Sequence, residues 1–181
     1  DINDRSALKL LVVGGSLGAQ VLNETVPKAL ALIERPFEVH HQCGRNNEAA
    51  TQAAYDEQDL SMHKFTVQPF IDDMAAAYNW ADIIVCRAGA LTVTEIQNVG
   101  IAAIFVPLPS AVDDHQTANA RTLTLHKAAI LLPQNELTPK RLSEELAALD
   151  RPACLEMAKK GHALANRQVC QHVANIIWQA L

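Results

Sequence analysis

The chain has few aromatic side chains and no long run of charge of one sign. Aromatic residues make up 4% of the 181 residues and hydrophobic residues 49%, so Ala, Val, Leu and Ile must fill the core. The formal net charge is −5 and no basic run occurs, which argues against a nucleic-acid-binding surface and against a patch for anionic lipids. The length suits one well-packed domain better than two.

The usual marks of secreted, metal-binding and membrane-spanning proteins are also missing. The four cysteines form no C-x-x-C pair, so we expect free thiols in a reducing compartment, with Cys86 a small buried hydrophobe. The seven histidines show no metal spacing, and the sequence predicts neither a metal site nor a cofactor. The apolar segment from Ile101 to Pro109 is far too short to cross a bilayer.

The beginning of the sequence lacks both an initiator methionine and a signal peptide. The first four residues, Asp1 to Asp4, are polar and acidic. A strand is predicted only a few residues later, so we expect a domain cut from a longer protein.

Short apolar runs alternate with helical segments along the whole chain. Strands are predicted at Leu8 to Val13, Phe37 to Gln42, Lys64 to Gln68, Ile83 to Cys86, Ala102 to Val106 and Ala128 to Leu132. Helices are predicted at Gln20 to Glu34, Glu48 to Gln58, Asp72 to Trp80, from Thr92 onward, and at Asp113 to His126, Thr138 to Leu149, Pro152 to Leu164 and Asn166 to Ala180. This alternation predicts a doubly wound α/β domain, a parallel sheet covered on both faces.

The stretch from Ala81 to Gly100 predicts a buried strand, a tight glycine loop and a helix N-terminus. Thr92 and Glu95 have the spacing of a capping box, and Leu91 and Ile96 can form the accompanying hydrophobic staple. Backbone N–H groups and the positive end of a helix dipole would then meet at one spot, which suits a phosphate. Glu95 has two interpretations: a residue that only caps its own helix, or a carboxylate that accepts hydrogen bonds from a ribose diol.

A second glycine loop, GGSLGA at Gly14 to Ala19, follows a strand and opens a helix. That context suits nucleotide phosphates, with Gly14, Gly15 and Gly18 in the phosphate loop. The loop lacks the dinucleotide fingerprint, because Val13 stands in place of the first glycine, and it is not a Walker loop. The alternative is a tight turn that needs only small residues.

Two further segments could contact a nucleotide sugar. His115, Gln116 and Asn119 can share one face at a helix start and offer imidazole and amide groups to sugar hydroxyls, or form only a solvated first turn. Phe70 and Ile71 could wall a flat base, or belong to the core. The loops after the first, fourth and fifth strands all carry Gly or polar clusters at strand C-termini, the edge where open parallel sheets bind ligands.

Taken together, five segments resemble the donor-binding half of the bacterial MurG family, the undecaprenyl-diphospho-muramoylpentapeptide N-acetylglucosaminyltransferases. They cover the chain from about Leu10 to Ala120 in the family's order and spacing: GGSLGA at Gly14–Ala19, HQCG at His41–Gly44, FIDDMAAAY at Phe70–Tyr78, ADIIVCRAGALTVTE at Ala81–Glu95 and DHQTANA at Asp114–Ala120. The resemblance implies one half of a GT-B glycosyltransferase, with two Rossmann-like domains facing across a cleft. It also implies inverting transfer of N-acetylglucosamine from UDP-N-acetylglucosamine to the muramoyl sugar of a lipid-linked acceptor in peptidoglycan synthesis.

The same resemblance implies a role for each matching residue. The Ile71 backbone should read the uracil edge, with Phe70 beside it, and Glu95 should hold the ribose diol. The diphosphate and the sugar should be faced by Ser16 and by the turn of Ala90, Leu91 and Thr92, with Gly89 before it. Hydroxyls of the N-acetylglucosamine should be reached by His115 and Gln116, and Asn119 also belongs to the substrate site. No residue of this chain is identified as the general base that the acceptor hydroxyl requires.

The family's other half, which would carry the acceptor site and the membrane contact, is absent from this sequence. The resemblance therefore implies that residues 1–181 are the donor domain and that the helix at 166–181 packs toward the missing half. It implies a cytoplasmic protein that is peripheral on the inner membrane when full-length. Three alternatives remain open: the soluble subunit of a split N-acetylglucosaminyltransferase, a UDP-sugar-binding module without catalysis, and a related UDP-N-acetylglucosamine epimerase, whose catalytic acids we cannot place.

Overall fold

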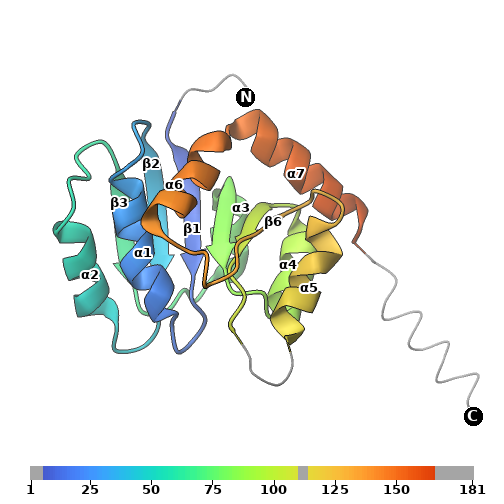
Figure 1. The fold of residues 1–181 in the computed structure, drawn as a ribbon, viewed down its shortest axis with the longest axis horizontal. Coiled ribbons are helices and arrows are strands. Elements are labelled where there is room, and N and C mark those ends of the chain that lie inside the picture. The colour runs from blue at the N-terminus through green and yellow to red at the C-terminus, as the bar shows by residue number, and fades with distance from the viewer. Residues whose placement is uncertain (1–5, 110–113, 166–181) are drawn as a thin grey trace, which may run out of the picture.

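The fold is a parallel sheet of six strands in the order β3-β2-β1-β4-β5-β6 (Figure 1). It comes from a computed structural model that describes residues 6–109 and 114–165. All neighbouring strands pair in parallel, and the order reverses between β1 and β4, so the α/β fold expected from the sequence is confirmed. The strands are β1 (Leu8–Val13), β2 (Phe37–Gln42), β3 (Lys64–Gln68), β4 (Ile83–Cys86), β5 (Ala102–Phe105) and β6 (Ile130–Leu131).

Helices cover both faces of the sheet, and each face has its own hydrophobic cluster. One cluster joins the sheet to α1, α2, α6 and the start of α7. The other joins it to α3, α4 and α5. The helices are α1 (Gln20–Leu30), α2 (Glu48–Asp56), α3 (Met74–Trp80), α4 (Ala90–Val99), α5 (His115–Thr124), α6 (Pro139–Ala148) and α7 (Arg151–Ala163).

The first four strands have the limits predicted from the sequence, whereas several other elements, α1 and β6 among them, are shorter than expected. Helix α1 ends at Leu30 instead of Glu34, because Leu32 and Ile33 donate to carbonyls three residues back and the last turn tightens. Strand β6 keeps only two of five predicted residues, since this edge strand pairs with β5 only at Ile130 and Leu131. The helix predicted at 166–180 lies outside the described residues.

The thiols of Cys43, Cys86 and Cys154 are free, as expected, and all three are buried, which was predicted only for Cys86. Cys86 is 1% exposed in the centre of the sheet, and burial raises the pKa of its thiol. Such a thiol packs as an apolar side chain.

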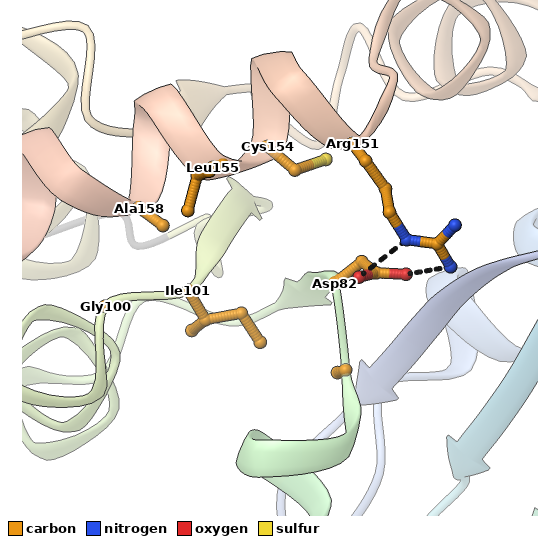
Figure 2. A pocket seen from close by; sticks show the side chains of 8 residues that line it. Asp82, Gly100, Ile101, Arg151, Cys154, Leu155 and Ala158 are labelled. Carbon is orange, nitrogen blue, oxygen red and sulfur yellow. Dashed lines mark hydrogen bonds and ion pairs between the residues drawn. The ribbon is translucent and has the colours of Figure 1, made fainter. Parts of the chain in front are cut away.

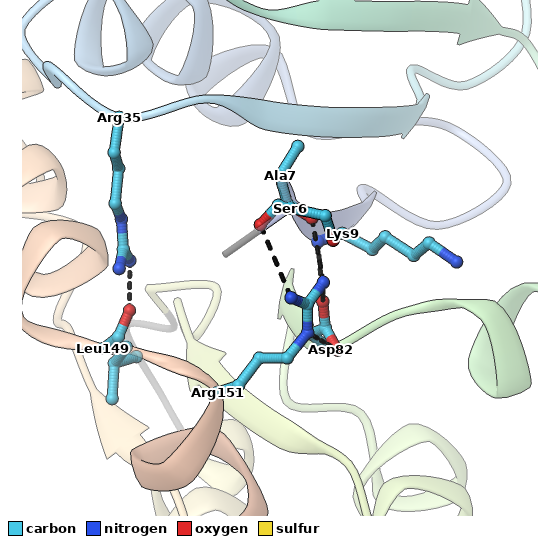
Figure 3. A network of polar contacts seen from close by, with 7 residues as sticks. All are labelled: Ser6, Ala7, Lys9, Arg35, Asp82, Leu149 and Arg151. Carbon is cyan, nitrogen blue, oxygen red and sulfur yellow. Dashed lines mark hydrogen bonds and ion pairs between the residues drawn. The ribbon is translucent and has the colours of Figure 1, made fainter. Parts of the chain in front are cut away.

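Helix α7 is tied to the end of the sheet at which the strands begin. Arg151, at the start of α7, donates to the carboxylate of Asp82 at 3.2 Å and to the carbonyl of Ala7 at 3.0 Å (Figure 3). Asp82 also accepts a hydrogen bond from the backbone N–H of Lys9 at 2.9 Å. Arg35 likewise donates to the carbonyl of Leu149 (Figure 3) and to that of Leu146. These contacts fix α6 and α7 to the sheet at the edge opposite the predicted site.

A cavity of about 290 Å³ lies beneath α7 at that edge (Figure 2). The Arg151–Asp82 ion pair closes one side of it, and Ile101, Cys154 and Leu155 form apolar walls. Both charged groups of the wall are paired with one another, so the cavity offers no free charge to a ligand.

Candidate functional site

Three loops leave the sheet side by side at the carboxyl edge. Val13 pairs with Cys86, and Cys86 pairs with Phe105, so the ends of β1, β4 and β5 stand at the same level in neighbouring strands. The loops that follow are the two glycine loops and the segment that leads to α5. The sequence-based prediction that these three loops share one edge is therefore confirmed, and the edge lies where the strand order reverses.

The first glycine loop requires glycine for two different reasons. Gly15 has φ +87°, and no atom lies within 4 Å of the place that a Cβ would take, so its backbone conformation alone favours glycine. Gly18 has φ +78°, and a Cβ there would lie 2.1 Å from the carbonyl oxygen of Cys43. The loop after β1 is thus pressed against the loop after β2, and the exposed residue Ser16 lies between the two glycines.

The second glycine loop starts its helix earlier than the sequence suggested, and the predicted capping box is wrong. Gly89 is the N-cap of α4, with extended backbone (φ −61°, ψ 148°) and no side-chain cap. Thr92 is therefore already inside the helix, and Leu91 is 80% exposed, so it cannot form a staple with Ile96. Glycine is tolerated at an N-cap, which lets the helix begin at Ala90.

This start leaves the backbone N–H groups of Ala90, Leu91 and Thr92 in the first turn of α4. First-turn N–H groups have no acceptor within their own helix. They lie next to the Gly14–Gly18 loop, because β1 and β4 are neighbours in the sheet. The two loops together offer backbone donors and the positive end of a helix dipole to an anion.

Glu95 lies one turn further along α4 with no capping role. Its side chain is exposed, and its Oε2 accepts a hydrogen bond of 2.8 Å from the hydroxyl of Tyr78 on α3. The pKa of the Tyr78 hydroxyl is raised, mainly because it is buried and to a lesser extent because it donates to Glu95. Sequence reasoning missed Tyr78, although it closes the FIDDMAAAY segment, because the contact joins two helices at a separation of 17 residues.

Phe70 and Ile71 approach the same end of α4 from the loop after β3. Ile71 belongs to the hydrophobic cluster that contains Val93 and Ile96 of α4, and Phe70 is 49% exposed. The N–H and C=O groups of Ile71 make no hydrogen bond within the described residues. The buried Ile71 side chain thus anchors a segment whose main-chain N–H and C=O groups have no partner among the described residues.

Gln116 and Asn119, predicted to contact a sugar, also hold the two neighbouring loops together. The Oε1 atom of Gln116 accepts from the N–H groups of Ala88 at 3.2 Å and Leu108 at 2.9 Å. The Nδ2 group of Asn119 donates to the carbonyl of Ala88 at 3.1 Å. The amide oxygen of Gln116 is thus used internally, and its Nε2 group is the part left for a ligand.

Arg87, which sequence reasoning did not consider, makes a further link between these loops. Its guanidinium donates to the carbonyls of Val106 at 3.1 Å and Pro107 at 3.2 Å, and burial lowers its pKa.

His115 is exposed in the first turn of α5, where the Asp114 carboxylate accepts from the N–H of Thr117 and caps the helix.

The predicted site residues thus gather at one edge of the sheet, on the loops after β1, β3, β4 and β5. A hollow of about 340 Å³ lies between α4 and α5, lined by Ala90, Val93, Thr94, Gln97, Asn119 and Thr122. Within the described ranges no group of three His, Cys, Asp or Glu side chains could hold a metal ion. None of the helices described here is long and apolar enough to cross a membrane.

Known proteins resemble this chain over its whole length. A protein of Psychrobacter cryohalolentis is 98% identical over 181 residues, which are 100% of this chain and 50% of the relative. A protein of Marinobacter nauticus is 52% identical over 96% of this chain and 48% of its own length. Both are described as UDP-N-acetylglucosamine–N-acetylmuramyl-(pentapeptide) pyrophosphoryl-undecaprenol N-acetylglucosamine transferase.

The fold agrees with these sequence relatives. The crystal structure of MurG from Acinetobacter baumannii superposes with a TM-score of 0.91 at 48% identity, over 96% of this chain and 50% of that one. The present chain therefore spans about half the length of the relatives it matches. The model of the glycosyltransferase family 28 C-terminal domain matches residues 9–173, and the chain belongs to this family.

Proposed function

We propose that this domain binds UDP-N-acetylglucosamine as the donor half of an inverting N-acetylglucosaminyltransferase. The full-length enzyme would transfer the sugar to undecaprenyl-diphospho-N-acetylmuramoyl-pentapeptide, the reaction that completes the lipid-linked precursor of peptidoglycan. One observation carries the proposal: the two glycine loops, the Ile71 main chain, which makes no hydrogen bond within the described residues, and the exposed carboxylate of Glu95 lie at the carboxyl edge of the sheet, where its strand order reverses.

Each part of a nucleotide sugar has a matching group at this edge. Ile71 offers a backbone donor and acceptor to the uracil edge with Phe70 beside it, and Glu95 accepts from the ribose hydroxyls. For the diphosphate there are Ser16, the Gly14–Gly18 loop and the first turn of α4. The sugar would then lie toward the start of α5, within reach of His115, of the Nε2 group of Gln116 and of Asn119.

The chemistry itself needs groups from the other half of the protein. In an inverting transfer the acceptor hydroxyl attacks the anomeric carbon, UDP leaves, and a base takes the hydroxyl proton. The donor side of this chain can hold the diphosphate and stabilise the charge that develops on it as the bond to the sugar breaks. We assign no residue of this chain as the base. The acceptor contacts and a peripheral position on the cytoplasmic face of the inner membrane are assigned to the half outside this sequence.

Glu95→Gln should weaken UDP binding by about 1–3 kcal/mol, because hydrogen bonds to a charged acceptor become bonds to a neutral one. The stability of the fold should change little, since Glu95 is exposed and caps no helix. Isothermal calorimetry with UDP measures the first effect, and thermal unfolding without ligand measures the second.

Glu156→Gln is the matched control for this experiment. It removes the same charge from an exposed glutamate on α7, where Glu156 pairs with Lys160 at the opposite edge of the sheet. UDP affinity should stay at the wild-type value. If Glu95→Gln behaved like this control, Glu95 would not be the ribose contact.

A further inference from the structure

The contact between Tyr78 and Glu95 joins a buried side chain to an exposed one. Tyr78 is 6% exposed and packs in the same cluster as Ile71, Val93 and Ile96, whereas Glu95 stands on the exposed side of α4. The hydroxyl of Tyr78 reaches Glu95 Oε2 at 2.8 Å, within the normal range for a phenol bound to a carboxylate. A hydroxyl anchored in the core thus holds one oxygen of the Glu95 carboxylate, which would otherwise rotate freely in solvent.

The bond still leaves room for a diol on the carboxylate. An ionised carboxylate has about four lone-pair positions, and the phenol occupies one of them. Oε1 and the remaining position on Oε2 stay open to two hydroxyl groups. Because burial raises the pKa of Tyr78, its hydroxyl stays protonated and keeps donating at neutral and mildly alkaline pH.

Helix α3 links this contact to the segment that would read the base. Asp73 caps α3 by accepting from the N–H of Ala76 at 2.8 Å, so the helix starts directly after the Phe70–Ile71 segment. Tyr78 lies on the last turns of the same helix. A single short helix therefore fixes the base-reading backbone at one end and the ribose-reading carboxylate at the other.

We propose that Tyr78 is a positioning residue for ribose recognition, which orients Glu95 and so sets the preference for ribonucleoside over 2′-deoxyribonucleoside diphosphates. This inference rests on the proposed binding of UDP-N-acetylglucosamine. Orienting the side chain in the free protein removes part of the conformational entropy that a glutamate loses on binding. Without the phenol, Glu95 would bind the diol from a wider set of rotamers, and affinity for UDP would fall more than affinity for 2′-deoxy-UDP.

Calorimetry with UDP and with 2′-deoxy-UDP tests this role in the wild-type chain and in Tyr78→Phe. The wild-type chain should prefer UDP by about tenfold, the scale of one hydrogen bond to a charged group. Tyr78→Phe should weaken UDP binding about three- to tenfold, with a smaller loss for 2′-deoxy-UDP, so that the preference narrows. When Glu95→Gln is already present, adding Tyr78→Phe should weaken UDP binding little further.

The substitution keeps the ring, and the partner that it leaves, Glu95, is exposed to water, so the fold should persist. Tyr55→Phe is the matched control, because Tyr55 is the other buried tyrosine and donates its hydroxyl to His41 in the opposite cluster. That variant should keep both affinities.

If Tyr78→Phe lowered the affinities for UDP and 2′-deoxy-UDP equally, or lowered neither affinity, the positioning role would be overturned. The proposed function would remain intact. Failure of the wild-type chain to bind UDP would instead overturn the proposed function, and this inference with it.

Discussion

Gly18→Ala is expected to lower the free energy of unfolding by about 2–5 kcal/mol, the sum of a left-handed backbone penalty and a steric clash. The clash arises because the new Cβ would lie 2.1 Å from the carbonyl oxygen of Cys43, a backbone atom that cannot rotate away. Relief would require the loop after β1, for which we propose diphosphate binding, to move away from the loop after β2. Chemical denaturation measures the loss, and calorimetry with UDP should show weakened binding in the variant.

Gly15→Ala is the control that separates the two causes. Gly15 also has positive φ, at +87°, but nothing lies within 4 Å of the new Cβ. Its cost should be only the backbone penalty, about 1–2 kcal/mol. Equal losses in the two variants would mean that the close approach to Cys43 is not what requires glycine at position 18.

The second large effect concerns a histidine in the core. His41 is fully buried, and burial lowers its pKa from 6.5 to about 3. Asn23 Oδ1 lies 3.0 Å from its Nε2, and the Tyr55 hydroxyl lies 3.0 Å from its Nδ1. Since Asn23 Oδ1 can only accept, Nε2 carries the proton and Tyr55 donates to Nδ1. The neutral ring is thus fully hydrogen-bonded, and a second proton would have to displace the Tyr55 donor.

The pH dependence of stability follows from this shift. Below about pH 6.5 the unfolded chain binds a proton at His41 that the folded protein does not bind, so the contribution is complete above that pH and is lost toward pH 3. The loss is about 1.4 kcal/mol per pH unit at most, or about 4–5 kcal/mol over the window. The free energy of unfolding, measured from pH 7 to pH 4, should therefore fall less steeply with decreasing pH in His41→Gln than in the wild-type chain.

Tyr55→Phe provides the comparison for that titration. It removes the hydroxyl beside His41 but leaves the ring buried, so it should lower stability at every pH and retain most of the slope. A wild-type slope in His41→Gln would show that other groups cause the acid sensitivity.

The sheet could be predicted from the sequence because burial on both faces makes its central strands, β1, β4 and β5, mostly apolar. Ile83–Cys86, which is wholly apolar, and Leu8–Val13, which is apolar except for Lys9, have the predicted limits for this reason. The loops that share the carboxyl edge could also be predicted, because in a parallel sheet every strand ends at the same edge. The position of the switch point between β1 and β4 then follows from strand order.

The first residue of α4 was predicted less accurately than the strands, because two N-terminal signals overlap in the sequence. Thr92 and Glu95 fit a capping box, but Gly89 followed by Ala90 allows the helix to begin earlier, and the earlier start prevails. The sequence does place Ala90 to Thr92 at the helix N-terminus, as the structure has them, but with different roles: all three lie in the first turn and none of their side chains caps it.

The sequence could not predict the hydrogen bonds that side chains make with other elements of the fold. Gln116 and Asn119 are expected from the sequence to face a sugar, and the structure gives Gln116 partners in the loops after β4 and β5 and Asn119 a partner in the loop after β4. Tyr78 was not considered, because nothing in a pattern shows that its hydroxyl meets a residue on the next helix. Such contacts depend on how α3, α4 and α5 pack, which is fixed by the hydrophobic cluster beneath them.

The most direct test of the central claim is a titration of UDP-N-acetylglucosamine into this chain, followed by an assay of transfer to a lipid-linked muramoyl-pentapeptide acceptor. The proposed function predicts saturable binding that free UDP displaces, with no transfer by this chain alone, because every assigned donor contact lies within it and no base does. A folded sample that binds neither UDP-N-acetylglucosamine nor UDP would contradict the donor site. Measurable transfer by this chain alone would contradict the claim that the base and the acceptor contacts lie in the other half.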